Sequence, residues 1–143
     1  MSLSDDDSIE RLVHGVVDRT LPKREWTHAG HFAAALWLTR HRRGLTAPDK
    51  IRVLITRYND ATNTPNTDTN GYHHTITLAS MRAAAAVLAG FPAATPIHAV
   101  LASLMASRFG NPDWLLVHWH RETLFSVPAR RDWVEPDLAP LPF

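Results

Sequence analysis

The chain has 143 residues, 45% apolar and 20% charged, so it is long enough to bury a hydrophobic core and is not a disordered chain. It has no cysteine, which excludes disulfide scaffolds, thiolate metal sites and cysteine nucleophiles. A net charge of +1 gives no basis for binding nucleic acid, and no apolar run reaches the roughly 18 residues of a membrane span. The acidic N-terminus lacks signal-peptide features, so we expect one cytoplasmic domain over residues 1–143.

Two helices are predicted in the first third of the chain. The first begins at Ser4, where three aspartates form the first turn, and its apolar residues keep helical spacing until Pro22 ends the pattern. The second begins near residues 25–27 and runs to Arg43, and Gly44 is expected to end it in the left-handed conformation that glycine favours. The second pattern is apolar nearly all round, which is typical of a buried helix.

The rest of the chain is predicted to hold further helices separated by turns. Thr46 is the expected N-cap of the third helix, with Pro48 in its first turn. A polar loop without periodicity spans residues 59–71, and connections of that length are more often functional. The later helices are predicted at residues 72–89, from Thr95–Pro96 to Gly110, and at residues 111–125, followed by a tail from Pro128.

These patterns predict an all-α, single-domain bundle of about five to six helices with an irregular, proline-rich C-terminal tail. The second and fourth helices are apolar nearly all round and are therefore expected to form the central pair. Short connections favour antiparallel neighbours, so the second helix would run up, the third down and the fourth up. The first turns of the second and fourth helices would then meet at one end of the bundle, together with the polar loop.

Histidines gather at that predicted end. His28 and His31 are three residues apart and so share one face of the second helix. His73 or His74, at the start of the fourth helix, would add a third imidazole. Three histidines with an open position for water form a known kind of catalytic metal site. We therefore predict that His28, His31 and His73 hold zinc or another divalent first-row metal.

Neighbouring polar residues are assigned supporting roles in this hypothesis. Glu25 or His74 would act as the catalytic base or as a fourth ligand, and Asp68 is a further candidate for that position. Tyr72 would orient a small-molecule substrate, with Asn66 and Asp68 of the loop also contacting it. The positive potential of a helix N-terminus lowers the pKa of a histidine and favours the neutral ring that a metal requires.

Structural interpretations of the same residues stay open. In a His-x-x-His segment at a helix start, the histidines can instead be capping or core residues that bond backbone carbonyls. The polar loop has the alternative interpretation of a solvated turn. The tryptophans are expected to pack in the core and at its rim. Four further histidines are expected at the surface, namely His41, His98, His118 and His120.

Two segments and the tail carry a resemblance to a protein family. Residues 25–32 read Glu-Trp-Thr-His-Ala-Gly-His-Phe, and residues 66–77 read Asn-Thr-Asp-Thr-Asn-Gly-Tyr-His-His-Thr-Ile-Thr. Together with residues 129–138, they resemble a family of small, all-helical bacterial proteins of uncharacterised function that carry WTHxxH-like and GYHET-like segments. The resemblance covers most of the chain from about residue 25 onward.

The resemblance implies no activity, but it implies that His28, His31, Tyr72 and His73 belong to one site. This sequence departs from the family pattern at His74, where relatives have a glutamate. If that carboxylate is a base or a metal ligand in the relatives, this chain lacks it. A histidine serves either role, with a different charge and metal affinity.

Three classes of function remain as hypotheses. The first is a metal-binding protein with a His-lined pocket that binds or hydrolyses a small molecule. The second is a metal-free module in which helix N-termini and histidines bind an anionic metabolite. The third is a structural protein that forms a homodimer through its tryptophan-rich end. Neither nucleic acid nor a membrane is an expected partner.

Overall fold

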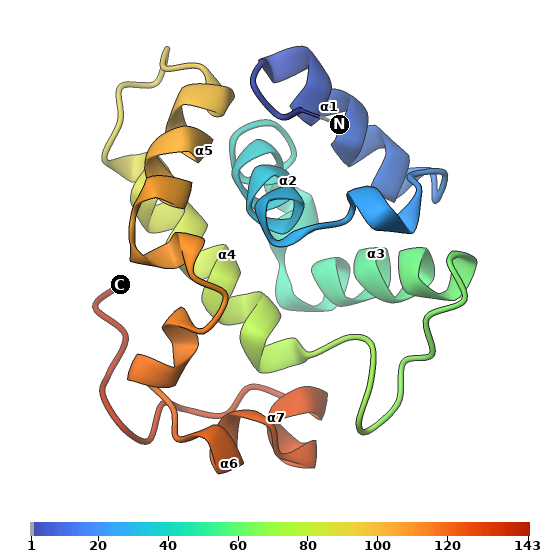
Figure 1. The fold of residues 1–143 in the computed structure, drawn as a ribbon, viewed down its shortest axis with the longest axis vertical. Coiled ribbons are helices and arrows are strands. Elements are labelled where there is room, and N and C mark those ends of the chain that lie inside the picture. Colours follow the sequence, from blue (N-terminus) through green and yellow to red (C-terminus); the bar gives the residue numbers. More distant parts are fainter. Residues whose placement is uncertain (1) are drawn as a thin grey trace.

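The computed structural model describes residues 2–143, and within these residues it contains helices and no strand, which confirms the all-α class (Figure 1). Within these residues seven α-helices occur. The segment predicted as the final helix, residues 111–125, contains only a 3₁₀ turn and one short α-helix, and the seventh helix, Val127–Arg131, overlaps the start of the tail that was predicted to be irregular. The helices are α1 (Asp6–Val17), α2 (His28–His41), α3 (Pro48–Ala61), α4 (His74–Ala89), α5 (Ile97–Ala106), α6 (Arg121–Leu124) and α7 (Val127–Arg131). Four 3₁₀ segments connect them, namely η1 (Lys23–Glu25), η2 (Arg43–Thr46), η3 (Arg108–Gly110) and η4 (Trp114–Val117).

The helix α2 is the centre of the fold, as its apolar pattern predicts. Every residue from Phe32 to Thr39 is buried, and α1, α4 and α5 all pack against it. Thr27 caps the helix by accepting a hydrogen bond from the N–H of Gly30. The helix α4 packs directly on α2 but buries only one stripe, so only one of the two predicted central helices is enclosed on all sides.

Two predicted helix boundaries are wrong because the chain turns through 3₁₀ structure between α2 and α3. Gly44 lies inside η2 and does not have a positive φ, so it is not a left-handed cap. Thr46 does not cap α3, because its hydroxyl donates to the carbonyl of Arg43 at 2.7 Å. The N-cap of α3 is Ala47, and the helix begins with Pro48.

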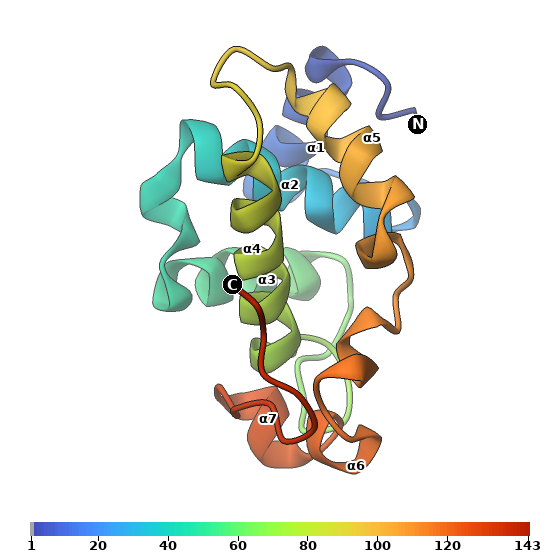
Figure 2. The ribbon, with the colours of Figure 1, turned by 90° about the vertical axis from the view of Figure 1, so that its left-hand side faces the viewer.

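The predicted up-down-up course of three helices is also wrong. In Figure 2, α2 runs across the picture whereas α4 runs from bottom to top, so the two helices cross instead of lying side by side. The helix α4 starts beside α7 and α6, whereas α2 starts next to α1 and η1 (Figure 1). The two helix N-termini therefore have different neighbours.

The polar loop between α3 and α4 is held in a defined conformation. Gly71 has a φ of +78°, and a Cβ atom there would lie 2.3 Å from the carbonyl oxygen of Pro65. Only glycine fits this position without strain. The loop brings the chain from the end of α3 to the start of α4 along the outside of the molecule (Figure 1).

The C-terminal third corrects one prediction about histidines. His118 is buried, not at the surface, and its Nδ1 donates to the carbonyl oxygens of Ala139 and Pro140, each at 3.1 Å. His41 and His120 are exposed, as predicted, and His98 is partly exposed and bonds Asp6. Buried His118 thus ties the tail, which has no regular structure beyond α7, to the body of the fold. None of the described helices is long and apolar enough to cross a membrane.

Candidate functional site

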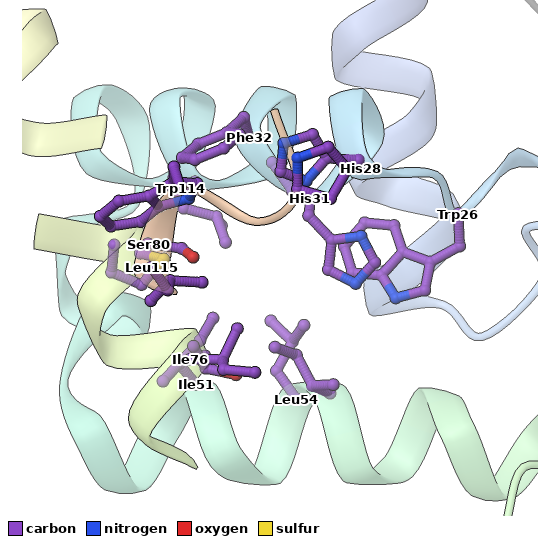
Figure 3. A pocket seen from close by; sticks show the side chains of 17 residues that line it. Trp26, His28, His31, Phe32, Ile51, Leu54, Ile76, Ser80, Trp114 and Leu115 are labelled. Carbon is purple, nitrogen blue, oxygen red and sulfur yellow. The ribbon is translucent and has the colours of Figure 1, made fainter. Parts of the chain in front are cut away.

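A cavity of about 260 Å³ lies between α2, α3, α4 and the η4 segment (Figure 3). Its size is near the lower end of the roughly 300–1,000 Å³ that small-molecule sites span. Its walls are mostly aliphatic and aromatic. The lining residues are Trp26, His28, His31, Phe32, Ala34, Ala35, Leu38, Ile51, Leu54, Ile55, Ile76, Thr77, Ser80, Met81, Pro112, Trp114 and Leu115.

His31 forms part of one wall. Its ring lies against the Trp26 indole, with 3.8 Å between ring centroids, and its Nδ1 is 2.7 Å from the carbonyl oxygen of Thr27. A carbonyl oxygen only accepts, so Nδ1 carries the proton of that hydrogen bond. In the neutral ring, Nε2 then has a free lone pair, and no residue among 2–143 bonds it.

The His31 side chain is exposed and also lines the cavity. Nearby protein atoms desolvate the ring, which lowers the pKa of His31, and the neighbouring His28 lowers it further, against the Thr27 hydrogen bond that raises it. A lowered pKa keeps the ring neutral near pH 7. The ring is therefore uncharged, and its Nε2 accepts hydrogen bonds.

His28 is held in a similar way. Its Nε2 donates to the carbonyl oxygen of Phe109 at 2.8 Å, which ties the start of α2 to η3. The other ring nitrogen, Nδ1, has no bond to a described residue. The structure brings His28 and His31 together, because both line the cavity (Figure 3).

Trp114 also lines the cavity, but its indole N–H is buried and closed off from the cavity. The residue is 3% exposed, and its indole N–H is the one buried side-chain polar atom of residues 2–143 that lacks a hydrogen-bond partner. Nearly all buried polar groups in folded proteins are paired, because leaving one unpaired costs about 1–3 kcal/mol. Figure 3 shows Trp114 and Ser80 on the side of the cavity opposite His31 and Trp26.

His73, the third predicted metal ligand, lies elsewhere and has no free nitrogen. Its Nε2 donates to the carbonyl oxygen of Leu124 at 2.7 Å, and its Nδ1 accepts from the N–H of Ile76, which makes it the N-cap of α4. Burial lowers the pKa of His73, so the ring is neutral with both nitrogens engaged. The residue does not line the cavity.

His74 and Tyr72 bond each other next to this cap. The Tyr72 hydroxyl lies 2.7 Å from Nδ1 of His74, and both residues are buried. Burial raises the pKa of Tyr72 to about 12 and lowers the pKa of His74. Neither side chain lines the cavity, so the predicted base and the predicted substrate-orienting residue lie outside it.

The two loop residues predicted to contact substrate form bonds within the protein. The Asn66 amide donates to the carbonyl of Thr56 and to Asp60, and its oxygen accepts from Asn59 and from the N–H of Tyr72. The Asp68 carboxylate forms two hydrogen bonds with Arg131, at 2.7 and 2.8 Å. These bonds anchor the loop to α3 and α7. Glu25, the other predicted base, lies in η1 and does not line the cavity.

The geometry thus divides the predicted site into two parts. His28 and His31 lie together at the cavity, whereas His73, His74, Tyr72, Asn66 and Asp68 hold α4 and its preceding loop in place. Among residues 2–143, no three His, Asp or Glu side chains are grouped to hold a metal ion. Sequence reasoning missed Trp114 and Ser80, since neither has a motif or spacing that marks it.

No protein-family model matches this chain, and neither the curated proteins nor the solved structures contain a significant match. The resemblance to a family of small bacterial proteins therefore stays a prediction. The functional argument rests on the site geometry alone.

Proposed function

We propose that this chain binds a small, uncharged, mainly apolar molecule in the cavity between α2, α3, α4 and η4. The observation that carries the proposal is the cavity of about 260 Å³, whose walls are aliphatic and aromatic apart from two histidines, one threonine and one serine. Burying the apolar surface of a ligand against such walls is favourable, at roughly 25 cal/mol for each Å² removed from water.

The composition of the walls supports an uncharged ligand. No lysine, arginine, aspartate or glutamate lines the cavity, so a charged group there would lose its hydration without gaining an ion pair. The lowered pKa of His31, caused by desolvation, removes the cation that an anionic metabolite would need. These features favour an uncharged ligand over the anionic metabolite.

The volume supports a ligand of one ring with substituents. An apolar cavity of roughly 150 Å³ is enough to bind benzene. About 260 Å³ leaves room for further heavy atoms on such a ring. Trp26, Phe32 and Trp114 offer aromatic surfaces to it.

Isothermal titration with uncharged alkylbenzenes tests the proposal. Leu54→Phe and Ile76→Phe each place extra atoms in the cavity and are expected to weaken binding at least about tenfold, because overfilling displaces the ligand. Val53→Phe is the matched control, since Val53 is 43% exposed on α3 and does not line the cavity. Absence of binding to the unaltered chain, or equal binding by all three variants, would reject the proposal.

A metal at this cavity is a second candidate, favoured by one observation. Nδ1 of His28 and Nε2 of His31 are both without protein partners, and in neutral rings both offer lone pairs. Two imidazoles would leave the remaining positions of zinc to water or substrate. Metal analysis of protein purified without a histidine tag decides this, and less than about a tenth of an equivalent after reconstitution would end it.

A further inference from the structure

A groove of about 540 Å³ lies between the end of α1, the η2 segment and α3, and a further hollow at Arg19 and Arg57 continues it along α3. Its volume lies within the range of roughly 300–1,000 Å³ that small-molecule sites span. We call it the basic groove after the cationic side chains that line it, namely Arg19, Arg42, Lys50 and Arg57. We infer that the basic groove binds an anionic amphiphile, a small molecule with a carboxylate or phosphate group on a hydrocarbon body.

The charge of the basic groove is not balanced by the protein. Besides the four cations, only two anionic side chains line it, Asp49 and Asp60, which leaves an excess of two positive charges. Asp60 also accepts a hydrogen bond from the amide of Asn66. None of the four cations forms an ion pair with a residue among 2–143, whereas Arg52 of the same helix α3 pairs with Asp132. A bound carboxylate or phosphate would supply the missing counter-charge, and planar guanidinium groups suit either anion.

Apart from its charged residues, the basic groove is lined by apolar side chains. Val17 of α1 is 39% exposed and Val53 of α3 is 43% exposed, and both line the groove together with Leu45 and Leu54. A hydrocarbon body packed on these side chains would remove them from water, which is favourable. An inorganic anion would leave them in water, and an uncharged apolar molecule would leave the cations without a counter-charge. The lining therefore favours a ligand that is both anionic and apolar.

One cation of the groove belongs to a residue with a strained backbone, since Arg19 has a φ of +63°. At the end of α1, its N–H donates to the carbonyl of Val16 at 3.2 Å, and the N–H of Thr20 donates to the carbonyl of Gly15 at 2.8 Å. This pair of bonds is the Schellman helix end, in which glycine is the usual left-handed residue because a Cβ atom strains that conformation. The chain instead has an arginine that lines the groove, and backbone strain recurs at binding sites. The position therefore supports a role in binding for the Arg19 side chain.

Isothermal titration with three probes tests the inferred ligand class. Octyl phosphate, used at concentrations where it is monomeric, carries both the anion and the hydrocarbon chain, whereas inorganic phosphate and 1-octanol each carry one of them. We expect octyl phosphate to bind at least about tenfold more tightly than either. Equal binding of inorganic phosphate or of 1-octanol would reject the amphiphile. Binding to vesicles that contain phosphatidic acid, without binding of octyl phosphate, would replace the small molecule with a membrane surface and overturn the inference.

Single substitutions assign the binding of octyl phosphate to the groove. Arg42→Gln and Arg57→Gln each remove one cation and should weaken binding about three- to tenfold, the effect of one charged contact at an exposed site. Arg11→Gln is the matched control, because Arg11 is exposed on α1 and does not line the groove. An equal loss in Arg11→Gln would show that the charge of the whole molecule, and not the groove, attracts the anion.

Arg19→Gly separates binding from folding at the strained position. The substitution removes a cation and relieves the left-handed residue, so it should weaken the binding of octyl phosphate while raising the unfolding temperature. An arginine present only for the fold would lose stability on replacement and leave binding as it was. Unchanged affinity in Arg19→Gly, Arg42→Gln and Arg57→Gln would reject the groove as the site.

Two further variants separate this site from the cavity of the proposed function, since Leu54 lines both. Val53→Phe fills the groove alone and should weaken octyl phosphate at least about tenfold without changing the affinity for ethylbenzene. Ile76→Phe fills the cavity alone and should do the reverse. If Ile76→Phe weakens octyl phosphate and Val53→Phe does not, the anion enters the cavity and the inference fails. Absence of ethylbenzene binding would reject the proposed function and leave the basic groove in place.

Discussion

Histidines lie at the starts of both α2 and α4, but the two groups have different roles. His31 at α2 and His73 at α4 each donate from one ring nitrogen to a backbone carbonyl. They differ in the second nitrogen. In His73 it accepts from a backbone N–H and completes a helix cap, whereas in His31 no described residue bonds it and the residue lines the cavity. The second ring nitrogen, and not the presence of a histidine pair, therefore separates a structural histidine from a candidate binding residue.

The largest effect that follows from this comparison is a loss of stability in His73→Ala. The substitution removes the cap of α4 and leaves the buried carbonyl of Leu124 without its donor. A lost cap costs about 1 kcal/mol and an unpaired buried group about 1–3 kcal/mol, so unfolding should become easier by about 3 kcal/mol. Urea denaturation measures this.

The same variant should bind the cavity probes with unchanged affinity at a temperature where it is folded, because His73 lies outside the cavity. His31→Phe should show the reverse pattern, with less than about 1 kcal/mol lost in stability, since its ring contact with Trp26 is retained. If His73→Ala weakens probe binding as much as His31→Phe does, the separation into two regions is wrong.

Acid should destabilise the fold through the region around α4. Burial lowers the pKa values of His73 and His74 below the 6.5 of an unfolded chain. As the pH falls through 6.5, the unfolded state binds protons that the folded state does not, so the free energy of unfolding decreases. Carboxylates such as Asp5, whose pKa is lowered by its hydrogen bonds from Ser8, ionise below 3.8 and do not contribute in this window.

Urea denaturation at about pH 7.5 and pH 5.5 checks the sign of this effect. The variant His73→Asn keeps a capping side chain without a titrating group and should lose less stability between the two pH values than the unaltered chain. Stability that rises on acidification, or an equal loss in His73→Asn, would contradict the assignment of neutral, buried rings at α4.

A smaller effect is expected at the loop before α4. Asn66→Ala removes four hydrogen bonds that join the loop to α3 and to the N–H of Tyr72. Because the residue is exposed and water replaces some of these bonds, we expect a loss of about 1–2 kcal/mol, measured by thermal unfolding. A drop in probe affinity without a change in stability would instead restore Asn66 as a ligand contact.

The smallest effect belongs to Asp68. Its ion pair with Arg131 is exposed, and surface ion pairs of this kind contribute little, so Asp68→Asn should leave the unfolding temperature and probe binding unchanged within error. Differential scanning calorimetry measures the unfolding temperature, and isothermal titration calorimetry measures probe binding. A clear loss of probe affinity would show that the loop reaches the ligand.

Local sequence signals predicted the elements of this fold well. The acidic first turn of α1 and the apolar pattern of α2 follow from short-range physical chemistry, although the N-cap of α1 is Asp5, one residue after the predicted start at Ser4. The arrangement of the helices in space was not predicted from these local signals. The 3₁₀ turn at Arg43–Thr46 redirects the chain, and no short-range rule predicts that turn. An antiparallel arrangement was assumed where the helices cross.

The candidate site was predicted only where a local sequence signal exists. The spacing of His28 and His31 places them on one helix face whatever the rest of the chain does. Trp114 joins them only through packing between residues 83 and 86 positions apart in sequence, which leaves no local pattern. His73 lies apart from them because it bonds the carbonyl of Leu124, which is 51 residues away and is likewise not marked by any local pattern.

The indole N–H resonance of Trp114 reports whether a ligand enters the cavity. The chain has five tryptophans, and Trp114→Phe identifies the relevant signal in a ¹⁵N-correlated NMR spectrum. Addition of ethylbenzene should shift this signal, because the Trp114 ring lines the cavity that the probe enters. The signals of Trp119 and Trp133, which already donate to Val134 and Glu135, should stay in place. A Trp114 signal that does not move while the probe binds would contradict the account.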